Sequence, residues 1–351
     1  MFTMLSLPLL VLVFVMAAVA VWFAGIQLSG TTNVIAARFK LGEAFGGLIL
    51  LALATNLPEI AIVVSGAVRH DVGLAVGNIL GGIAVQTVVL VLLDAVGVHD
   101  GHPLSSRTTT LALVLEATLV IAVLVVAVMG SQIPDTVIFA RLTPEDVLIA
   151  ALWLVGLWLL NKARTGLPWL LSPDDNAPER PGKDAKGKDG AGGMSTARAI
   201  TVFAVSAIVT LAAGVVLAES GSQIAGHIGL SGVLFGATVL AVATSLPEIS
   251  TGLASVKLGD YETAFSDIFG GNAFLPVLFL VATVISGQAV LPHAQATDIY
   301  LDVLGILLTT VYIYGLIFRP QRRVLRMGVD SFVVLVLYAV GIIGLVAVAH
   351  R

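Results

Sequence analysis

A segment of nine residues occurs twice in this chain, and this repeat constrains the fold more than any other feature. The first copy is Ala-Leu-Ala-Thr-Asn-Leu-Pro-Glu-Ile, from Ala52 to Ile60, and the second is Ala-Val-Ala-Thr-Ser-Leu-Pro-Glu-Ile, from Ala241 to Ile249. An offset of 189 residues relates the two copies, and the same offset aligns the chain from Gly25 to Gly82 without a gap. Chance similarity between small-residue helices does not explain an ungapped match that includes Pro-Glu. The chain is therefore an internal duplication.

Composition places this duplication in a membrane. Of the 351 residues, 58% are hydrophobic and only 11% are charged, whereas a soluble domain carries roughly 25% charged residues. The chain has no cysteine, which excludes disulfides, thiolate metal sites and cysteine nucleophiles. No basic patch indicates a nucleic-acid partner. The chain is predicted to be a polytopic membrane protein.

Hydrophobic runs long enough to cross the bilayer divide the chain into two sets. A span needs roughly 20 helical residues, and on that basis ten spans are predicted at 5–28, 42–68, 72–97, 108–130, 144–161, 198–219, 231–257, 261–286, 299–318 and 329–348. A polar segment rich in Gly, Pro and Lys, typical of a flexible linker, gives the domain boundaries 1–161, 162–197 and 198–351. Because each half has five spans, the second half enters from the opposite side. The predicted fold is an all-α polytopic membrane protein of ten transmembrane helices in two inverted-topology five-helix repeats.

Lysine and arginine predict the orientation, because cytoplasmic loops carry an excess of both. Fifteen of the 18 fall on the side that contains the linker, and only Arg69, Arg141 and Arg351 fall on the other. The linker is therefore predicted to be cytoplasmic and both termini extracytoplasmic, with the cell membrane as the expected location.

The Pro-Glu pairs predict a cation site at the midplane. Proline has no amide hydrogen, so Pro58 and Pro247 leave the carbonyls of Ala54 and Ala243 without their helical partners. Such carbonyls must face protein, water or an ion. The remaining oxygen donors of the two segments are the side chains of Thr55, Asn56, Glu59, Thr244, Ser245 and Glu248. All-oxygen sites suit hard cations, whereas a single proline of this kind is equally explained by a structural kink.

The helix after each break adds further candidate ligands. Asn78, Gly82 and Gln86 are spaced at i, i+4 and i+8 and so share a face. The positions related to them by the repeat are Asp267, Gly271 and Leu275, with Asn272 as an additional amide. The glycines by themselves are equally well explained by close helix packing. Asp267 is an ionisable group within a span and is a functional candidate by default.

These residues resemble a known family. The two Ala-Thr-(Asn/Ser)-Leu-Pro-Glu segments, together with Gly77-Asn-Ile-Leu-Gly-Gly82 and Ser266-Asp-Ile-Phe-Gly-Gly-Asn272, look like the paired signatures of the cation/calcium exchanger superfamily. The resemblance implies that the second, third, seventh and eighth helices form an ion site, and that Ca²⁺ is exchanged against Na⁺ or H⁺. It also implies that the first and sixth helices, with Gly25, Gly30, Gly214 and Gly221, slide against the others.

The chain departs from the family pattern at several positions. A liganding Asn or Asp of the family falls on Gln86 in the first repeat and on Leu275 in the second, and Leu275 cannot bind a cation. Glycine is replaced by Ala54 and Ala243, and serine by Asn56. Asp267 could take over the missing ligand if the ion is displaced. These departures leave open the number of ions bound and the coupling ion.

Protons are expected to compete with the cation at Glu59 and Glu248. Two glutamates about 4 Å apart repel by about 4 kcal/mol at an effective dielectric of 20, and a proton on one of them removes this repulsion.

The other charges in the spans carry less information about function. Glu116 lies near the midplane of the fourth span, where it is either a proton relay or the partner of a polar group. The acidic residues near span ends are expected to be solvated: Asp94, Glu219, Asp302 and Asp330.

The sequence thus predicts a secondary antiporter that works by alternating access, with inorganic cations and the lipid bilayer as its partners. It has no expected cofactor besides the transported cation and is not expected to be an enzyme, since paired span aspartates and a His-Glu-x-x-His motif are both lacking. Three alternatives remain: an antiporter for Mg²⁺, Mn²⁺ or a monovalent cation, a passive cation channel, and a homologue that no longer transports.

Overall fold

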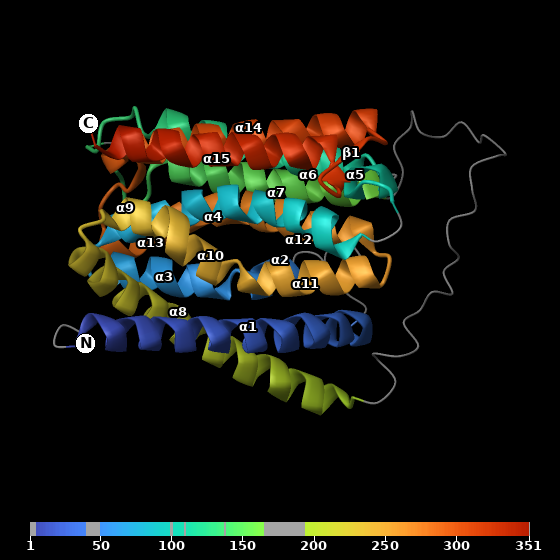
Figure 1. Cartoon of the computed structure of the whole chain (residues 1–351). Coiled ribbons are helices and arrows are strands. Elements are labelled where there is room, and N and C mark those ends of the chain that lie inside the picture. The colour runs from blue at the N-terminus through green and yellow to red at the C-terminus, as the bar shows by residue number, and fades with distance from the viewer. Residues whose placement is uncertain are drawn as a thin grey trace.

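The computed structural model describes residues 5–39, 50–98, 101–108, 110–136, 138–164 and 194–350. They form a bundle of helices whose long axes run mostly in one direction (Figure 1). Within these residues eight helices are long and apolar enough to cross a membrane, and the bent pair Gly232–Thr244 and Leu246–Lys257 can count as a ninth. The predicted all-α polytopic class is confirmed.

The first half contains seven α-helices in the part of the chain that the structure describes. They are α1 (Leu7–Arg38), α2 (Leu50–Thr55), α3 (Leu57–Val68), α4 (Val72–Leu92), which continues as the π-helix η2 (Leu93–Gly97), α5 (Leu104–Arg107), α6 (Ala112–Gly130) and α7 (Pro144–Arg164).

The second half has the same order of long helices. Its elements are α8 (Thr196–Ile228), α9 (Gly232–Phe235), the π-helix η4 (Gly236–Leu240), α10 (Ala241–Thr244), α11 (Leu246–Lys257), α12 (Tyr261–Phe274), the 3₁₀ turn η5 (Leu275–Val277), α13 (Leu278–Ser286), the 3₁₀ turn η6 (Leu291–His293), α14 (Ala296–Phe318), β1 (Arg323–Val324), β2 (Met327–Gly328) and α15 (Val329–Ala349).

Two predictions fall partly outside the described residues. The predicted span 42–68 includes residues 40–49, so only its α2 and α3 portions can be compared. Most of the predicted linker, residues 165–193, is likewise outside, while α7 extends to Arg164 and α8 begins at Thr196. The number of ten spans therefore remains a prediction.

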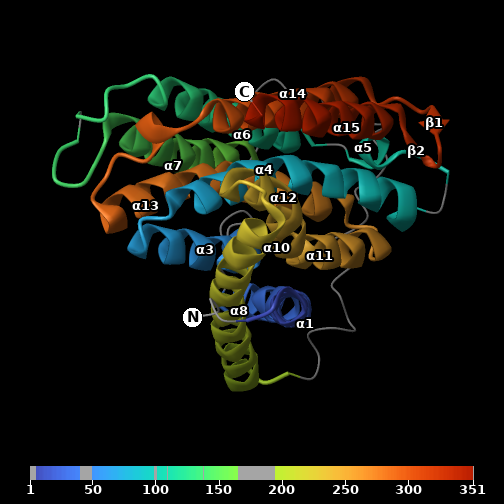
Figure 2. The ribbon, with the colours of Figure 1, turned by 60° about the vertical axis from the view of Figure 1, so that its left-hand side comes forward.

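Helices α1 and α8 are longer than the spans predicted for them. They contain 32 and 33 residues, which at 1.5 Å per residue is close to 50 Å, against a hydrocarbon core of about 30 Å. Helix α8 continues to Ile228 and is ended by Gly229, which has a φ of 72°. In both views α1 lies at one side of the bundle, and α8 crosses α1 and reaches α9; Figure 2 shows this crossing to be steep.

The other helices stack in layers away from this pair. Helices α3 and α11 lie next to α1 and α8, α4 and α12 occupy the middle, and α14 and α15 form the opposite side (Figures 1 and 2). Close packing in the middle depends on glycine, since a Cβ on Gly77 of α4 would lie 2.7 Å from the backbone oxygen of Val233. The layer arrangement places α4 and α12 between the duplicated breaks on one side and α14 and α15 on the other.

The acidic residues expected to be solvated are instead buried. Asp94 is 0% exposed because its carboxylate accepts the backbone N–H groups of Leu104 (2.8 Å) and Gly328 (2.6 Å). Glu219 is buried in an ion pair with Arg69. Asp330 packs against Gly315 and Gly328, and Asp302 lies one turn from the buried Asp298 in α14. The expectation failed because position along a span does not show which loops fold back over its end.

Candidate functional site

The two repeated segments form matching breaks in the helices. Helix α2 ends at Thr55 and α3 begins at Leu57, while α10 ends at Thr244 and α11 begins at Leu246 with a bend of 41°. In the first break the Asn56 amide still donates to the Ala52 carbonyl at 3.2 Å, and the Ile60 amide donates to the Asn56 carbonyl at 3.0 Å. The missing bonds are therefore confined to the residues around each proline.

The buried carbonyls at the breaks follow from this geometry. Ala54 and Ala243 are 3% and 6% exposed, and neither carbonyl can receive the usual helical bond because the residue four positions on is proline. Glu59 and Glu248 each occupy the first turn of the following helix, where the positive end of the helix dipole favours a carboxylate. Each break thus offers carbonyl and carboxylate oxygens within one turn.

Both glutamates are fully buried and incompletely satisfied. Neither oxygen of Glu59 has a hydrogen-bond partner among the described residues, although the Thr244 hydroxyl lies beside this carboxylate. Glu248 Oε1 accepts a long bond of 3.4 Å from Gln86 Nε2, and its Oε2 has no partner in the described chain. Buried carboxylates without partners are costly, so these oxygens favour a cation or a proton between them.

Threonine side chains join the two halves reciprocally. The Thr244 hydroxyl lies 3.4 Å from Asn78 Oδ1, and the Thr55 hydroxyl lies 3.5 Å from Asp267 Oδ1. Thr55 and Thr244 are related by the 189-residue offset, and so are Asn78 and Asp267. The same contact is therefore formed twice, each time between one half and the other, as a pseudo-two-fold axis requires. The candidate site needs both repeats.

Asp267 is the point at which this symmetry is broken. Its Oδ2 accepts a short hydrogen bond from the hydroxyl of Thr251 in α11, and its side chain is 1% exposed. Thr251 was missed in the sequence because its repeat partner is Ile62. Thr251 follows Glu248 by three residues, which places both on one face of the helix. This spacing could have identified Thr251 as a site residue from the sequence.

Gln86 and Leu275 are related by the 189-residue offset. They give the site one polar side and one apolar side. A Cβ on Gly271 would lie 2.9 Å from Asn56 Nδ2 and 3.5 Å from Gln86 Oε1, whereas one on Gly82 would lie 3.7 Å from the Leu275 side chain. Leu275 is 0% exposed. The predicted loss of a ligand in the second repeat therefore leaves hydrocarbon where the first repeat has an amide.

The remaining candidates lie in the same region but use their donors locally. Asn56 Nδ2 donates to the Ala52 carbonyl at 2.6 Å, and the Ser245 hydroxyl donates to the Ala241 carbonyl at 2.8 Å. Asn272 Nδ2 ties α12 to α4, since it lies 3.1 Å from the Thr87 hydroxyl. The acceptor oxygens of Asn56 and Asn272 are left without partners among the described residues. The side-chain amide nitrogens of Asn56 and Asn272 are therefore bonded to protein groups, and their oxygens are available to bind a cation.

The outer helices touch the breaks directly, each from the opposite half. A Cβ on Gly25 of α1 would lie 2.8 Å from Pro247 Cβ, and one on Gly214 of α8 would lie 2.9 Å from the Pro58 carbonyl oxygen. The glycines are related by the repeat, as are the prolines. Each outer helix therefore lies against the break of the other half without an intervening side chain.

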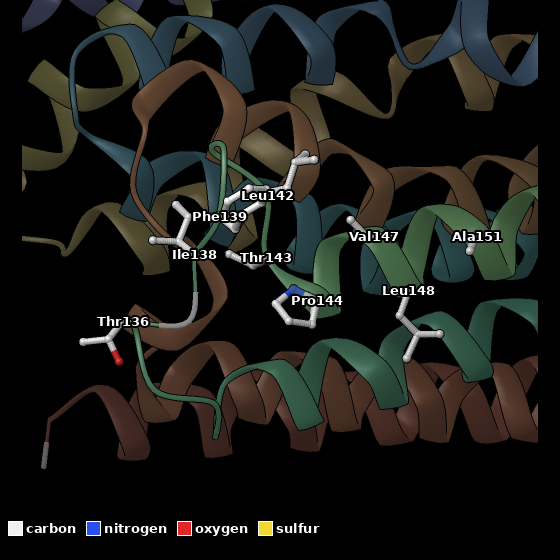
Figure 3. A pocket seen from close by; sticks show the side chains of 9 residues that line it. All are labelled: Thr136, Ile138, Phe139, Leu142, Thr143, Pro144, Val147, Leu148 and Ala151. Atoms are coloured by element: carbon white, nitrogen blue, oxygen red, sulfur yellow. The ribbon is translucent and has the colours of Figure 1, made fainter.

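A wide depression elsewhere on the molecule is not part of this site. It has a volume of about 810 Å³ and lies where the chain between α6 and α7 meets the start of α7 (Figure 3). Its lining is Thr136, Ile138, Phe139, Leu142, Thr143, Pro144, Val147, Leu148 and Ala151. With no carboxylate or amide side chain in that set, it lacks the ligands that a hard cation needs.

The chain is similar to known proteins over most of its length. The family model described as sodium/calcium exchanger protein matches residues 9–161 and 198–347. The inner membrane protein YrbG of Escherichia coli (strain K12) is 25% identical over 276 residues, which cover 76% of this chain and 77% of that protein.

Solved structures share the fold. One of the sodium-calcium exchanger NCX_Mj, soaked with 10 mM Na⁺ and 10 mM Sr²⁺, has a TM-score of 0.63 at 16% identity and covers 96% of this chain and 99% of that one. The crystal structure of the H⁺/Ca²⁺ exchanger CAX has a TM-score of 0.62 at 13% identity, covering 97% and 87%.

Proposed function

The chain belongs to the sodium/calcium exchanger protein family, and from this premise we propose that it is an antiporter that carries Ca²⁺ against Na⁺ or H⁺ by alternating access. In this proposal the cation binds between the two helix breaks. Glu59 and Glu248 replace its hydration shell, supported by the carbonyls of Ala54 and Ala243 and by oxygens of Thr55, Asn56, Asn78, Gln86, Thr244 and Asp267.

One observation carries this proposal. Fully buried oxygens without hydrogen-bond partners in the described chain come from both halves of the duplication, namely both oxygens of Glu59, Oε2 of Glu248, Oε1 of Gln86 and Oδ1 of Asn56. A hard cation satisfies several acceptor oxygens at once. Each buried acceptor without a partner costs free energy, and a cation between the two breaks would offset that cost at several of them.

The apolar side of the site limits the number of cations that it can hold. Where the first repeat offers Gln86, the second offers Leu275, which supplies no oxygen. We therefore propose a single divalent cation held toward Glu59 and Glu248, in place of several Na⁺ ions spread over both sides. The coupling ion is then whichever of Na⁺ or H⁺ displaces the divalent cation from these carboxylates.

Transport assays in proteoliposomes test the proposal and name the coupling ion. We expect ⁴⁵Ca²⁺ uptake to be driven by an outward Na⁺ gradient or by an outward H⁺ gradient, and to stop when that gradient is removed. Uptake that continues without any counter-ion would identify a passive channel. No uptake under either gradient would contradict Ca²⁺ as the substrate, and Mg²⁺, Mn²⁺ and monovalent cations would then be assayed.

Calcium binding is expected to weaken as the pH falls. A protonated carboxyl does not ligate a cation, so a proton on Glu59 or Glu248 must leave before Ca²⁺ binds. Linkage predicts a loss of up to about tenfold in affinity per pH unit for each proton displaced. Isothermal titration at about pH 6 and about pH 8 measures this, within the range where buried carboxyl groups titrate. Equal affinity at the two values would contradict the proposal.

Orientation and location follow the charge distribution. We propose that the linker side, with Arg107, Lys257 and Arg319, is cytoplasmic and that both termini are extracytoplasmic in the cell membrane. The Arg69–Glu219 ion pair between α3 and α8 then lies toward the outer face.

A further inference from the structure

We propose that residues 319–328, which join α14 to α15 and are called here the arginine hairpin, bind the anionic headgroups of the phospholipid leaflet at that end of the bundle. The proposal goes beyond ion exchange and requires only that α14 and α15 cross the bilayer.

The two flanking helices place the hairpin at the membrane surface. Helices α14 and α15 contain 23 and 21 residues, and each is apolar enough to span a bilayer. About 20 helical residues cross the hydrocarbon core, so a turn directly between two such helices lies at headgroup level. Figure 1 shows β1 beside α5 at one end of the bundle.

The hairpin turn is strained in a way that presents its side chains outward. Strands β1 and β2 pair Val324 with Met327, which leaves Leu325 and Arg326 as the two turn residues with φ of 50° and 71°. Such turns favour Asn-Gly because both residues need positive φ, and a bulky leucine there is an outlier. Leu325 is 74% exposed. The turn thus holds an apolar side chain and a guanidinium at its tip.

The charge of the hairpin is uniformly positive. Its four arginines are Arg319, Arg322, Arg323 and Arg326, and the sequence contains no acidic residue between Asp302 and Asp330. Arg323 donates to the Arg326 carbonyl, whereas Arg319, Arg322 and Arg326 are exposed and form no ion pair with any described residue. Guanidinium groups match the geometry of phosphate oxygens. An exposed apolar side chain on a segment with several exposed arginines complements an anionic lipid surface.

The hairpin is fixed to the bundle. The Gly328 amide donates to Asp94 Oδ2 at 2.6 Å, and the other oxygen of Asp94 accepts the Leu104 amide. Gln321 lies 3.1 Å from His102. These contacts hold the backbone of the hairpin in place before a lipid binds, so the ordering cost of binding is limited to the arginine side chains.

A second tight turn provides a matched control. Residues 139–142 form an isolated bridge between Phe139 and Leu142, with φ of 51° at Ala140 and 61° at Arg141. Phe139 is 85% exposed, but Arg141 donates to the Val284 carbonyl at 3.1 Å. This turn presents an exposed apolar side chain at its bridge position and has one arginine, which is bonded to a backbone carbonyl, so it is not expected to select anionic lipid.

Fluorescence quenching tests the proposal. Since the natural chain has no cysteine, Leu325→Cys and Phe139→Cys each carry one fluorophore, in nanodiscs that contain nitroxide-headgroup phosphatidylglycerol or phosphatidylcholine. We expect phosphatidylglycerol to quench the label at position 325 about twofold more than phosphatidylcholine does, and both lipids to quench position 139 equally. Added salt should reduce the difference.

Charge-removal variants decide the outcome. The triple change Arg319→Gln, Arg322→Gln and Arg326→Gln is expected to abolish the lipid preference at position 325. The control change Arg38→Gln, Arg198→Gln and Lys257→Gln removes the same charge from other exposed residues and should leave the preference intact. Equal quenching by both lipids, or a preference that survives the hairpin changes, would overturn the proposal. The readout involves no transport, so it stands apart from the test of ion exchange.

Discussion

Replacing Glu59 or Glu248 by Gln is expected to reduce gradient-driven ⁴⁵Ca²⁺ uptake by about 100-fold or more. Each side chain is 0% exposed and lies in the first turn after a break, so the change removes one negative charge and adds two hydrogens that face the cation. A loss of about 2.7 kcal/mol in cation binding corresponds to 100-fold, which is modest for a buried ligand charge. Glutamine has nearly the same volume, so the helix break itself is preserved.

Glu145→Gln is the matched control for these variants. Glu145 also follows a proline, occupies the first turn of a helix and is 3% exposed, but it packs against Gly130 at the far end of α6. Uptake by this variant is expected to remain close to that of the natural protein. If Glu59→Gln and Glu248→Gln also transported normally, the cation would not bind between the breaks, and the proposed site would be wrong.

Filling the contact between an outer helix and a break is expected to have the second largest effect. Gly25→Leu introduces a side chain where the Cβ alone would lie 2.8 Å from Pro247 Cβ and 3.0 Å from its Cα, and Gly214→Leu meets the Pro58 carbonyl oxygen at 2.9 Å. Neither proline can withdraw, because its backbone forms the break. The outer helix must therefore shift away, and we expect uptake to fall by tenfold or more, an effect of about 1.4 kcal/mol or greater.

The same helices supply the controls. Gly30 in α1 and Gly226 in α8 have no atom within 4 Å of a built Cβ, so Gly30→Leu and Gly226→Leu should transport normally. Gly25→Ala and Gly214→Ala, with a smaller intrusion, should give intermediate rates. Size-exclusion profiles and thermal unfolding establish that each variant is folded. A folded Gly25→Leu protein with unimpaired flux would show that close contact at the break is not needed for exchange.

The sequence by itself predicted the all-α architecture, the helix breaks and the candidate ligands. An ungapped repeat with an odd number of spans in each half predicts two inverted halves, and Pro58 and Pro247 predict helix breaks with unpaired carbonyls. Both inferences rest on local covalent properties, namely the missing amide hydrogen of proline and the hydrophobic length of a span. They needed no knowledge of which residues meet, and the helical breaks occur at the expected positions.

Only the tertiary structure decided which groups face one another. It joined Asp267 to Thr55 and Thr251, set Gln86 beside Glu248, and buried Asp94 beneath the arginine hairpin. The sequence assigned Asp94 to solvent and did not single out Thr251. Helical periodicity specifies the face of a single helix, but burial and pairing depend on contacts between segments up to 234 residues apart. Such contacts arise from the packing of whole helices, which no local pattern encodes.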